Sequence, residues 1–148
     1  MKSSQRLKPI KTLADNKEKT AAQNLGKSVK DRHQQIEKLT QLVGYRSEYM
    51  QNMTVRTQQG MSGEKLQQYH QFLSKLDTAI DHQNSLVTQS EQSVSQNQKN
   101  WRSDNGRASA INKVITNLKI KETRKQDKQD ADRVDELSTQ AFLRSKQL

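Results

Sequence analysis

The chain has 148 residues, of which 30% are hydrophobic and 4% aromatic, and it carries a formal net charge of +10. A globular domain usually contains close to half apolar residues, so this composition excludes a wide hydrophobic core and leaves an unfolded chain or a thin arrangement of helices. Cysteine is absent, which excludes a disulfide framework and a thiol nucleophile.

The first nine residues are expected to form a flexible tail that ends at Pro9, the only proline. The starting sequence MKSSQRLKPIKTL is basic but lacks the apolar run of a secretory signal peptide. No segment approaches the roughly 20 apolar residues that a membrane span needs. We therefore expect a soluble, cytoplasmic protein.

A first helix is predicted over residues 10–57, which are rich in Gln, Lys, Leu and Ala, with Pro9 suited to open it. Its apolar residues recur at alternating steps of three and four, which is the heptad pattern of a coiled coil. One series consists of Ala22, Val29, Ile36, Val43 and Met50. The interleaved series consists of Leu25, Arg32, Leu39, Arg46 and Met53.

A turn is predicted over residues 58–63, where two glycines lie close together, and Ser62 can cap the helix that follows. A second helix is predicted over 64–142, followed by a tail over 143–148. Every seventh residue of this helix is apolar, namely Leu66, Leu73, Ile80, Val87, Val94, Trp101, Ala108 and Ile115. The interleaved series is apolar at its ends but polar in its middle, at Gln83, Ser90, Asn97 and Asp104.

Two heptad helices joined by a tight turn run antiparallel. The sequence therefore predicts an all-α fold, a long antiparallel two-helix coiled coil that forms a single hairpin. The two helices are expected to meet along a seam, and the expected core residues of this seam are Val29, Ile36, Leu39, Val43, Met50, Leu73, Ile80, Val87, Val94 and Trp101. An alternative for Trp101 is contact with a partner protein.

The charges are distributed unevenly along the chain. Residues 1–30 and residues 99–128 each carry a net charge of +6, whereas residues 31–98 carry −1. In an antiparallel hairpin the two basic segments lie side by side, so the end of the hairpin that holds the termini is strongly basic. Beyond about residue 118 the second helix has no partner, and Val134, Leu137, Ala141 and Phe142 form a short apolar patch there.

The residue pattern speaks against catalysis and against a cofactor. Neither a dinucleotide-binding nor a phosphate-binding glycine motif is present. His33, His70 and His82 are too scattered for a metal site, and Asp77 and Asp81 are expected on a solvated helix face. Nucleic-acid binding is disfavoured, since the basic residues are mostly Lys and are spread over both helices. We expect neither an enzyme nor a metalloprotein.

A second stripe of apolar residues lies near the predicted turn. Leu42, Tyr45 and Tyr49 share one face of the first helix, and Phe72, Leu76, Ala79 and Gln83 share one face of the second. Two interpretations are open. The stripe is a widened part of the seam, or it is an exposed patch that binds another protein, as clustered surface aromatics often do.

Four segments along the chain are LADNKEKTAAQNLG, LVGYRSEYMQ, YHQFLSKLDTAIDHQ and KNWR. Together they resemble the flagellar export protein FliJ family, the stalk-like component of the flagellar type III export ATPase complex. The resemblance runs through nearly the whole chain. It implies an antiparallel coiled coil similar to the γ stalk of rotary ATPases. It also implies a protein of the cytoplasm that is associated with the export apparatus at the inner membrane.

The resemblance implies partners for two surfaces. The end with both termini would enter the export ATPase ring and promote its assembly, through residues Lys11, Leu13, Lys17, Arg124, Lys125, Val134 and Leu137. The stripe would bind the cytoplasmic part of the export gate, through Leu42, Tyr45, Tyr49, Phe72, Leu76, Ala79 and Gln83. Gln83 and the neighbouring Lys38 depart from the family pattern. A role in handling export chaperones is also implied, with neither nucleic acid nor a cofactor.

Two alternatives to this function are open from the residues alone. One is the equivalent stalk of a virulence type III secretion system, because the physical pattern is the same. The other is a generic basic coiled-coil adaptor, which would not change the activity or the assembly of an ATPase.

Overall fold

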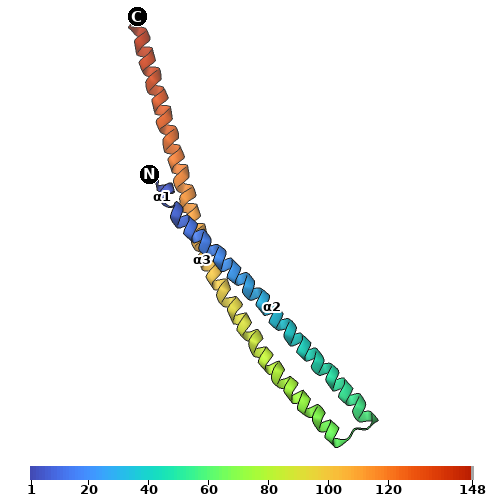
Figure 1. The fold of residues 1–148 in the computed structure, drawn as a ribbon. Helices are drawn as coiled ribbons and strands as arrows, with labels where there is room; N and C mark the ends of the chain where they lie inside the picture. The colour runs from blue at the N-terminus through green and yellow to red at the C-terminus, as the bar shows by residue number, and fades with distance from the viewer. Residues whose placement is uncertain (148) are drawn as a thin grey trace. The chain divides into compact units, whose positions relative to one another are not determined.

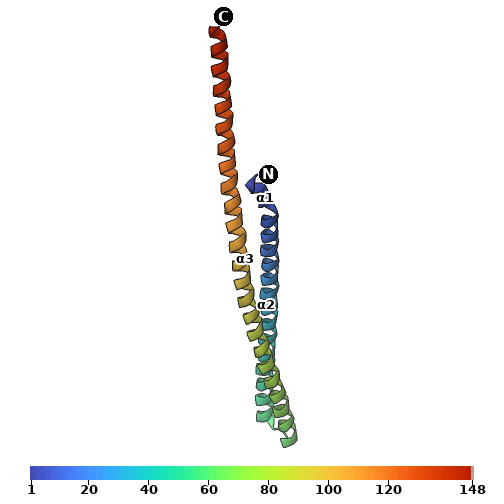
Figure 2. The same ribbon diagram turned by 90° about the vertical axis from the view of Figure 1, so that its left-hand side faces the viewer.

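The computed structural model describes residues 1–147 and contains three helices: α1 (Ser3–Arg6), α2 (Lys8–Gln59) and α3 (Gly63–Lys146). The expected all-α hairpin is confirmed, since α2 and α3 pack against each other in an antiparallel arrangement (Figures 1 and 2). The long helices extend a few residues beyond the predicted ranges of 10–57 and 64–142. Residue 148 of the predicted C-terminal tail lies outside the described residues.

Proline explains why the helix at the N-terminus is interrupted. Residues 1–9 were expected to form a tail, whereas in the structure Ser3–Arg6 is helical and Pro9 is the second residue of α2. Proline has no N–H to donate to the carbonyl of Gln5, and its ring crowds that carbonyl, so a continuous helix cannot pass through this point. The chain breaks at Leu7 and resumes as α2 at Lys8.

The turn between the long helices has ordinary capping chemistry. Gly60 follows the end of α2 with a φ of 99°, a left-handed conformation that glycine adopts without strain. Its N–H donates to the carbonyl of Thr57 at 3.2 Å. On the other side, the hydroxyl oxygen of Ser62 accepts a hydrogen bond from the Lys65 N–H at 3.2 Å, which caps α3 as expected.

The chain divides into two units, and each is built from parts of both long helices. Unit 1 consists of Met1–Lys19 and Ser103–Leu148, and unit 2 consists of Thr20–Arg102. In each, the core is a narrow seam between the two helices. The buried apolar residues are Ala14, Ala108 and Ile115 in unit 1 and Ala21, Tyr69, Leu73 and Val94 in unit 2.

The seam of α3 follows the predicted heptads. Leu73 and Val94 are buried, and Ile80, Val87 and Trp101 are half-buried. The polar members of the interleaved series also lie in the seam, because Gln83 and Ser90 are buried. The middle of the coiled coil is therefore polar, and α2 must supply hydrogen-bond partners for it.

The expected core of α2 requires a correction in one of its two series. Val29, Ile36 and Val43 are 39%, 40% and 48% exposed, so they lie outside the seam. The seam runs instead through the residue just before each of them, namely Ser28, Gln35 and Leu42, together with the interleaved Leu25, Leu39 and Met53, while Met50 is half-buried beside it.

Hydrogen bonding explains this shift of one residue. The amide nitrogen of Gln83 donates to the main-chain carbonyl of Gln35 at 2.9 Å and to its side-chain oxygen at 2.8 Å. An Ile36 side chain in that place would leave the buried Gln83 amide without a side-chain partner, at a cost of about 1–3 kcal/mol. Ser28 and Ser90 bond to carbonyls of their own helices. Polar positions of α2 therefore pair with the polar middle of α3.

Candidate functional site

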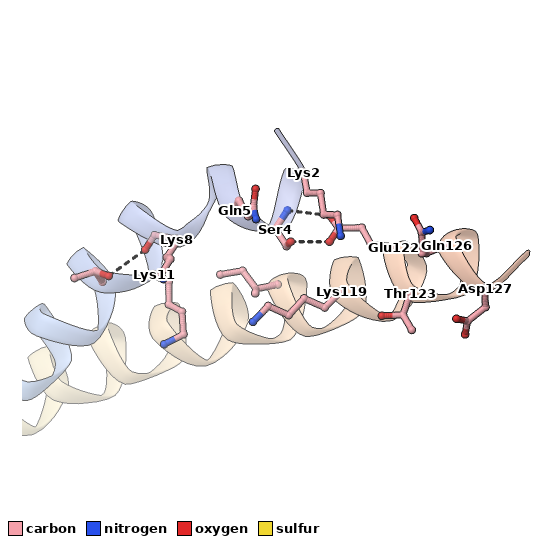
Figure 3. Close-up of a pocket in the computed structure, with 12 residues that line it drawn as sticks. Lys2, Ser4, Gln5, Lys8, Lys11, Lys119, Glu122, Thr123, Gln126 and Asp127 are labelled. Atoms are coloured by element: carbon pink, nitrogen blue, oxygen red, sulfur yellow. Dashed lines mark hydrogen bonds between the residues drawn. The ribbon is translucent and has the colours of Figure 1, made fainter. Parts of the chain in front are cut away.

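A basic cavity of about 620 Å³ lies in unit 1, between the N-terminal residues and α3. Four of its lining residues are lysines, Lys2, Lys8, Lys11 and Lys119, and Figure 3 shows them on both sides of the gap. The two basic segments found in the sequence therefore meet here in space. An open site lined by ammonium groups favours acidic partners, because exposed carboxylates gain from the positive potential. We call this cavity with its lysines the basic end.

The short helix α1 is attached to α3 by one residue pair. The Ser4 main-chain N–H donates to one oxygen of the Glu122 carboxylate at 3.1 Å, and the Ser4 hydroxyl donates to the other oxygen at 2.7 Å (Figure 3). Both hydrogen bonds favour the ionised carboxylate, and they hold the pKa of Glu122 below its ordinary value. The pair closes one wall of the basic end.

This pair predicts a pH dependence of α1 docking. The pKa of Glu122 in the folded chain is lower than its ordinary value of 4.5. The stability that the Ser4–Glu122 hydrogen bonds give to the folded chain is therefore fully present above pH 4.5. This stability is lost as the pH falls through the lower pKa that Glu122 has in the folded chain. We expect the Ser4 amide to become exchange-labile in acid, measured by NMR hydrogen exchange. Glu122→Gln should remove this acid transition. An unchanged transition in that variant would contradict the assignment to Glu122.

Asp15 is another carboxylate of unit 1 that accepts hydrogen bonds. Lys11 donates to Asp15 at 2.7 Å, and the Asn112 amide donates to the other Asp15 oxygen at 3.3 Å. The hydrogen bond from Lys11 is the main cause of a lowered pKa of Asp15. The charge of Lys11 is therefore partly balanced by Asp15, and the charges of Lys2 and Lys119 act on Glu122 and help to lower its pKa. The cavity remains basic because its four lysines outnumber its two lining carboxylates, Glu122 and Asp127.

The residues that the sequence assigned to an ATPase-binding end all lie in unit 1 but are not gathered at one spot. Lys11 lines the cavity, and Leu13 and Lys17 are exposed farther along α2. Arg124 and Lys125 are exposed on α3, next to the cavity residues Thr123 and Gln126. Sequence reasoning missed Lys2, Lys8, Lys119 and Glu122, although the charge totals of the two segments pointed to this region.

The last part of α3 has no helix beside it (Figures 1 and 2), and every residue from 123 to 147 is exposed. Val134, Leu137, Phe142 and Leu143 are each between 54% and 61% exposed. The Lys146 ammonium lies 4.7 Å from the centre of the Phe142 ring, at cation–π distance. We call residues 123–147 the overhang, a helix with an uncovered apolar patch.

The stripe near the turn is divided between the seam and the surface of unit 2. Leu42, Leu76 and Ala79 are half-buried and Gln83 is buried. Tyr49 is half-buried too, with its ring centre 4.8 Å from that of Tyr69 and 4.5 Å from that of Phe72. Desolvation by this packing is the main cause of a raised pKa of Tyr49.

Two aromatic side chains of the stripe face solvent. Tyr45 is 58% exposed and Phe72 is 45% exposed. Each directly precedes a seam residue, Arg46 or Leu73, so the two lie on the same edge of the antiparallel pair. We call Tyr45, Phe72 and the half-buried Ala79 the aromatic edge. The stripe is therefore part of the seam at Leu42, Tyr49 and Leu76 and part of the exposed surface at Tyr45 and Phe72.

Residues 1–147 contain neither a metal-binding cluster nor a helix suited to span a membrane. Within this range no three His, Asp or Glu side chains are arranged to hold a metal ion. None of the helices described there is long and apolar enough to cross a membrane. His33 lies 3.0 Å from Glu37 on the surface of α2, a pair that one helical turn explains.

Comparison with known proteins gives the family. The sequence model of the family described as "Flagellar FliJ protein" matches residues 2–147. The chain belongs to the FliJ family. Two curated relatives carry the name Flagellar FliJ protein. The relative from Salmonella typhi is 27% identical over 138 residues, and the relative from Escherichia coli (strain K12) is 25% identical over 138 residues.

Each match covers 93% of this chain and 94% of the relative, so this FliJ-family chain and its relatives correspond over almost their whole lengths. The resemblance found in the sequence is confirmed at the level of the family. Membership makes the chain a flagellar protein.

Proposed function

We propose that this chain is a non-enzymatic component of the flagellar type III protein export apparatus, in which unit 1 binds the ring of the export ATPase and promotes its assembly. The observation that carries the proposal is the combination in unit 1 of a lysine-lined cavity and an uncovered helical overhang. Lysines give long-range attraction to an acidic partner, and exposed apolar residues give short-range binding energy.

Unit 2 would provide the second contact, with the cytoplasmic part of the export gate. The aromatic edge supports this role, because Tyr45 and Phe72 expose large apolar surface although a seam lies next to them. A protein that binds the ATPase through one unit and the gate through another can couple the two. Such partners would keep the chain in the cytoplasm at the inner membrane, and a role in handling export chaperones fits the same location.

The test of the ATPase role is the hydrolysis rate and the ring assembly of a purified flagellar export ATPase, with and without this chain. We expect both to increase in its presence. No change in either would remove the proposal and favour a generic adaptor. Restoration of swimming in a strain that lacks its own FliJ protein would separate a flagellar stalk from a virulence stalk.

The gate role gives a prediction for the aromatic edge. Tyr45→Ala and Phe72→Ala should each cost on the order of 1–2 kcal/mol of binding to the gate's cytoplasmic part, because exposed aromatic side chains tend to dominate such interfaces. Isothermal titration calorimetry measures the affinity, and thermal melting followed by circular dichroism measures stability. Tyr45→Ala should melt close to the parent chain, and Phe72→Ala should lose a little stability because its ring packs on Tyr49. Leu76→Ala should lose both stability and affinity.

Val55→Ala serves as the control, since Val55 is an exposed apolar residue of unit 2 outside the aromatic edge. This substitution should change neither the affinity for the gate nor the melting temperature. If Tyr45→Ala and Phe72→Ala bind the gate as the control does, the aromatic edge is not the gate contact. Large losses of melting temperature in both would mean that these rings mainly stabilise the hairpin.

A further inference from the structure

A row of aliphatic side chains in unit 2 is left uncovered by the coiled coil. Val29, Ile36 and Val43 recur every seventh residue, so they form a line along α2. Each of these residues is between 39% and 48% exposed. Each residue directly follows a seam position, whereas Tyr45 and Phe72 directly precede one. The aliphatic row therefore lies on the edge opposite the aromatic edge, and the function proposed above does not use it.

The residues of α3 that border this row can be identified from contacts across the helices. Asp77, Asn84 and Glu91 each directly follow a seam residue of α3, as the aliphatic row does on α2. Unit 1 shows that residues directly after a seam position on the two helices lie on one edge. There Asp15 and Asn112 each follow a seam residue, and the Asn112 amide donates to Asp15 at 3.3 Å. In unit 2 the Arg46 guanidinium reaches Asp77 at 2.6 Å on the same edge. The aliphatic row is therefore flanked by Asp77, Asn84 and Glu91.

The border on α3 is acidic. Between residues 76 and 98, α3 carries the three carboxylates Asp77, Asp81 and Glu91 and no Lys or Arg. Asp81 is one helical turn from Asp77 and lies on the outer side of the same edge. Arg46 balances Asp77, which leaves Asp81 and Glu91 as the open charges. The edge thus has an apolar wall from α2 and an acidic wall from α3.

Two glycines beside the aliphatic row have no role inside the chain. Nothing lies within 4 Å of the place where a side chain would begin at Gly26 or Gly44. Glycine in a helix interior costs about 1 kcal/mol relative to alanine, and no close internal approach requires it here. Gly26 is one turn before Val29, and Gly44 follows Val43, so the backbone of α2 is bare at both ends of the row. A neighbouring helix can approach closely there.

We propose that this edge binds a basic amphipathic α-helix of a partner protein, which packs beside α2 and α3 as a third helix. Its apolar residues cover Val29, Ile36 and Val43, and its Lys and Arg side chains lie against Asp81 and Glu91. Apolar burial supplies most of the affinity, and the carboxylates select a basic helix over an acidic one.

A second copy of this chain fits the edge less well. A two-fold axis at Ile36 would place Val29 of each copy against Val43 of the other, which favours pairing. The same axis would bring the acidic borders of the two copies together, with Asp81 and Glu91 unbalanced in each. Like charges held opposite each other are unfavourable, so charge complementarity favours a basic partner.

The experiment uses two synthetic helical peptides of about 20 residues, long enough to span the row at 1.5 Å per residue. Both have leucine at heptad positions; one carries Lys and Arg on its flanks, and the other carries Glu there. Fluorescence anisotropy at physiological salt measures binding of each to the full chain. We expect the basic peptide to bind at least tenfold more tightly than the acidic peptide.

Variants of the chain locate the binding site. Ile36→Lys should weaken binding of the basic peptide at least tenfold, whereas the matched Val55→Lys, at an exposed valine away from the edge, should not change it. The double variant Asp81→Lys/Glu91→Lys keeps the aliphatic row and should reverse the preference between the peptides. If Ile36→Lys lowers the melting temperature, its loss of binding could reflect unfolding. The double variant still tests the binding site in that case, because it predicts a reversed preference and not a loss of binding.

Three outcomes would overturn the proposal. They are equal binding of both peptides, unchanged preference in the double variant, and a dimer in sedimentation equilibrium that Ile36→Lys abolishes. The last would assign the edge to a second copy of the chain. None of these outcomes depends on the export ATPase or on the gate, so the proposal stands or falls separately from the proposed function.

Discussion

Val94→Asp is expected to lower the free energy of unfolding by about 3–5 kcal/mol, because it places an unpaired carboxylate in the seam of unit 2. Val94 is only 4% exposed, the lowest value among the buried apolar residues. The surrounding seam is narrow, and no large side chain in the described part of the chain is completely enclosed. A thin core has few other contacts to compensate such a loss, so unit 2 should lose most of its helix.

The measurement is urea denaturation followed by circular dichroism, with Val55→Asp as the control. This control makes the same chemical change in the same unit at a valine that is 53% exposed. It should shift the free energy of unfolding by no more than about 0.5 kcal/mol. Equal effects of the two substitutions would contradict the seam described here, since position 94 would then be no more buried than position 55.

The α3 side of the seam could be predicted from the sequence because only one heptad assignment places apolar residues at regular positions along it. From Leu66 to Ile115 every seventh residue is apolar, and no neighbouring series competes with it. The capping role of Ser62 was equally predictable, since it depends only on residues close in the sequence. Local chemistry and one-helix periodicity were therefore sufficient for these features.

The α2 side could not be fixed in the same way, because two heptad patterns share the series through Leu25 and Leu39. Counting apolar residues selects Val29 and Ile36 as their partners, whereas the structure selects Ser28 and Gln35. The choice depends on Gln83 in the other helix, which needs the oxygens of Gln35. A pattern read along one helix does not contain this requirement, since it concerns the pairing of two helices.

The candidate functional residues were also only partly predictable, because their neighbours on the other helix are not visible in the sequence pattern. Charge totals predicted a basic end, but not that Glu122 would anchor Ser4 there, or that Lys11 would be paired with Asp15. The stripe was predicted as one surface, yet Tyr49 packs on Tyr69 and Phe72, while Tyr45 faces solvent. Periodicity identifies a face of a helix, whereas the neighbours of each side chain decide which members of that face stay available to a partner.

Removal of residues 134–148 is expected to reduce stimulation of the export ATPase at least tenfold while leaving the hairpin stable. The deleted segment holds the apolar patch with Val134, Leu137 and Phe142, which are each between 58% and 61% exposed. All residues from 123 to 147 are exposed, so the deletion removes little burial from either unit. Burial of each large apolar side chain by the ATPase would contribute about 1.5–3 kcal/mol to binding. Deletion of the patch removes this contribution, which accounts for the size of the effect.

The basic end should contribute through charge, and salt separates its contribution from that of the overhang. Lys8→Glu/Lys119→Glu reverses two cavity lysines and should weaken stimulation most at low ionic strength, because salt screens exposed charges over about 8–10 Å at physiological concentrations. The truncation should show much less dependence on salt. Lys65→Glu reverses a charge in unit 2, which is not part of the basic end, and should leave stimulation unchanged. ATPase rates measured across a salt series, alongside melting curves, distinguish these effects. If the truncated chain and the double variant both stimulate as the parent does at every salt concentration, unit 1 is not the part that binds the ATPase.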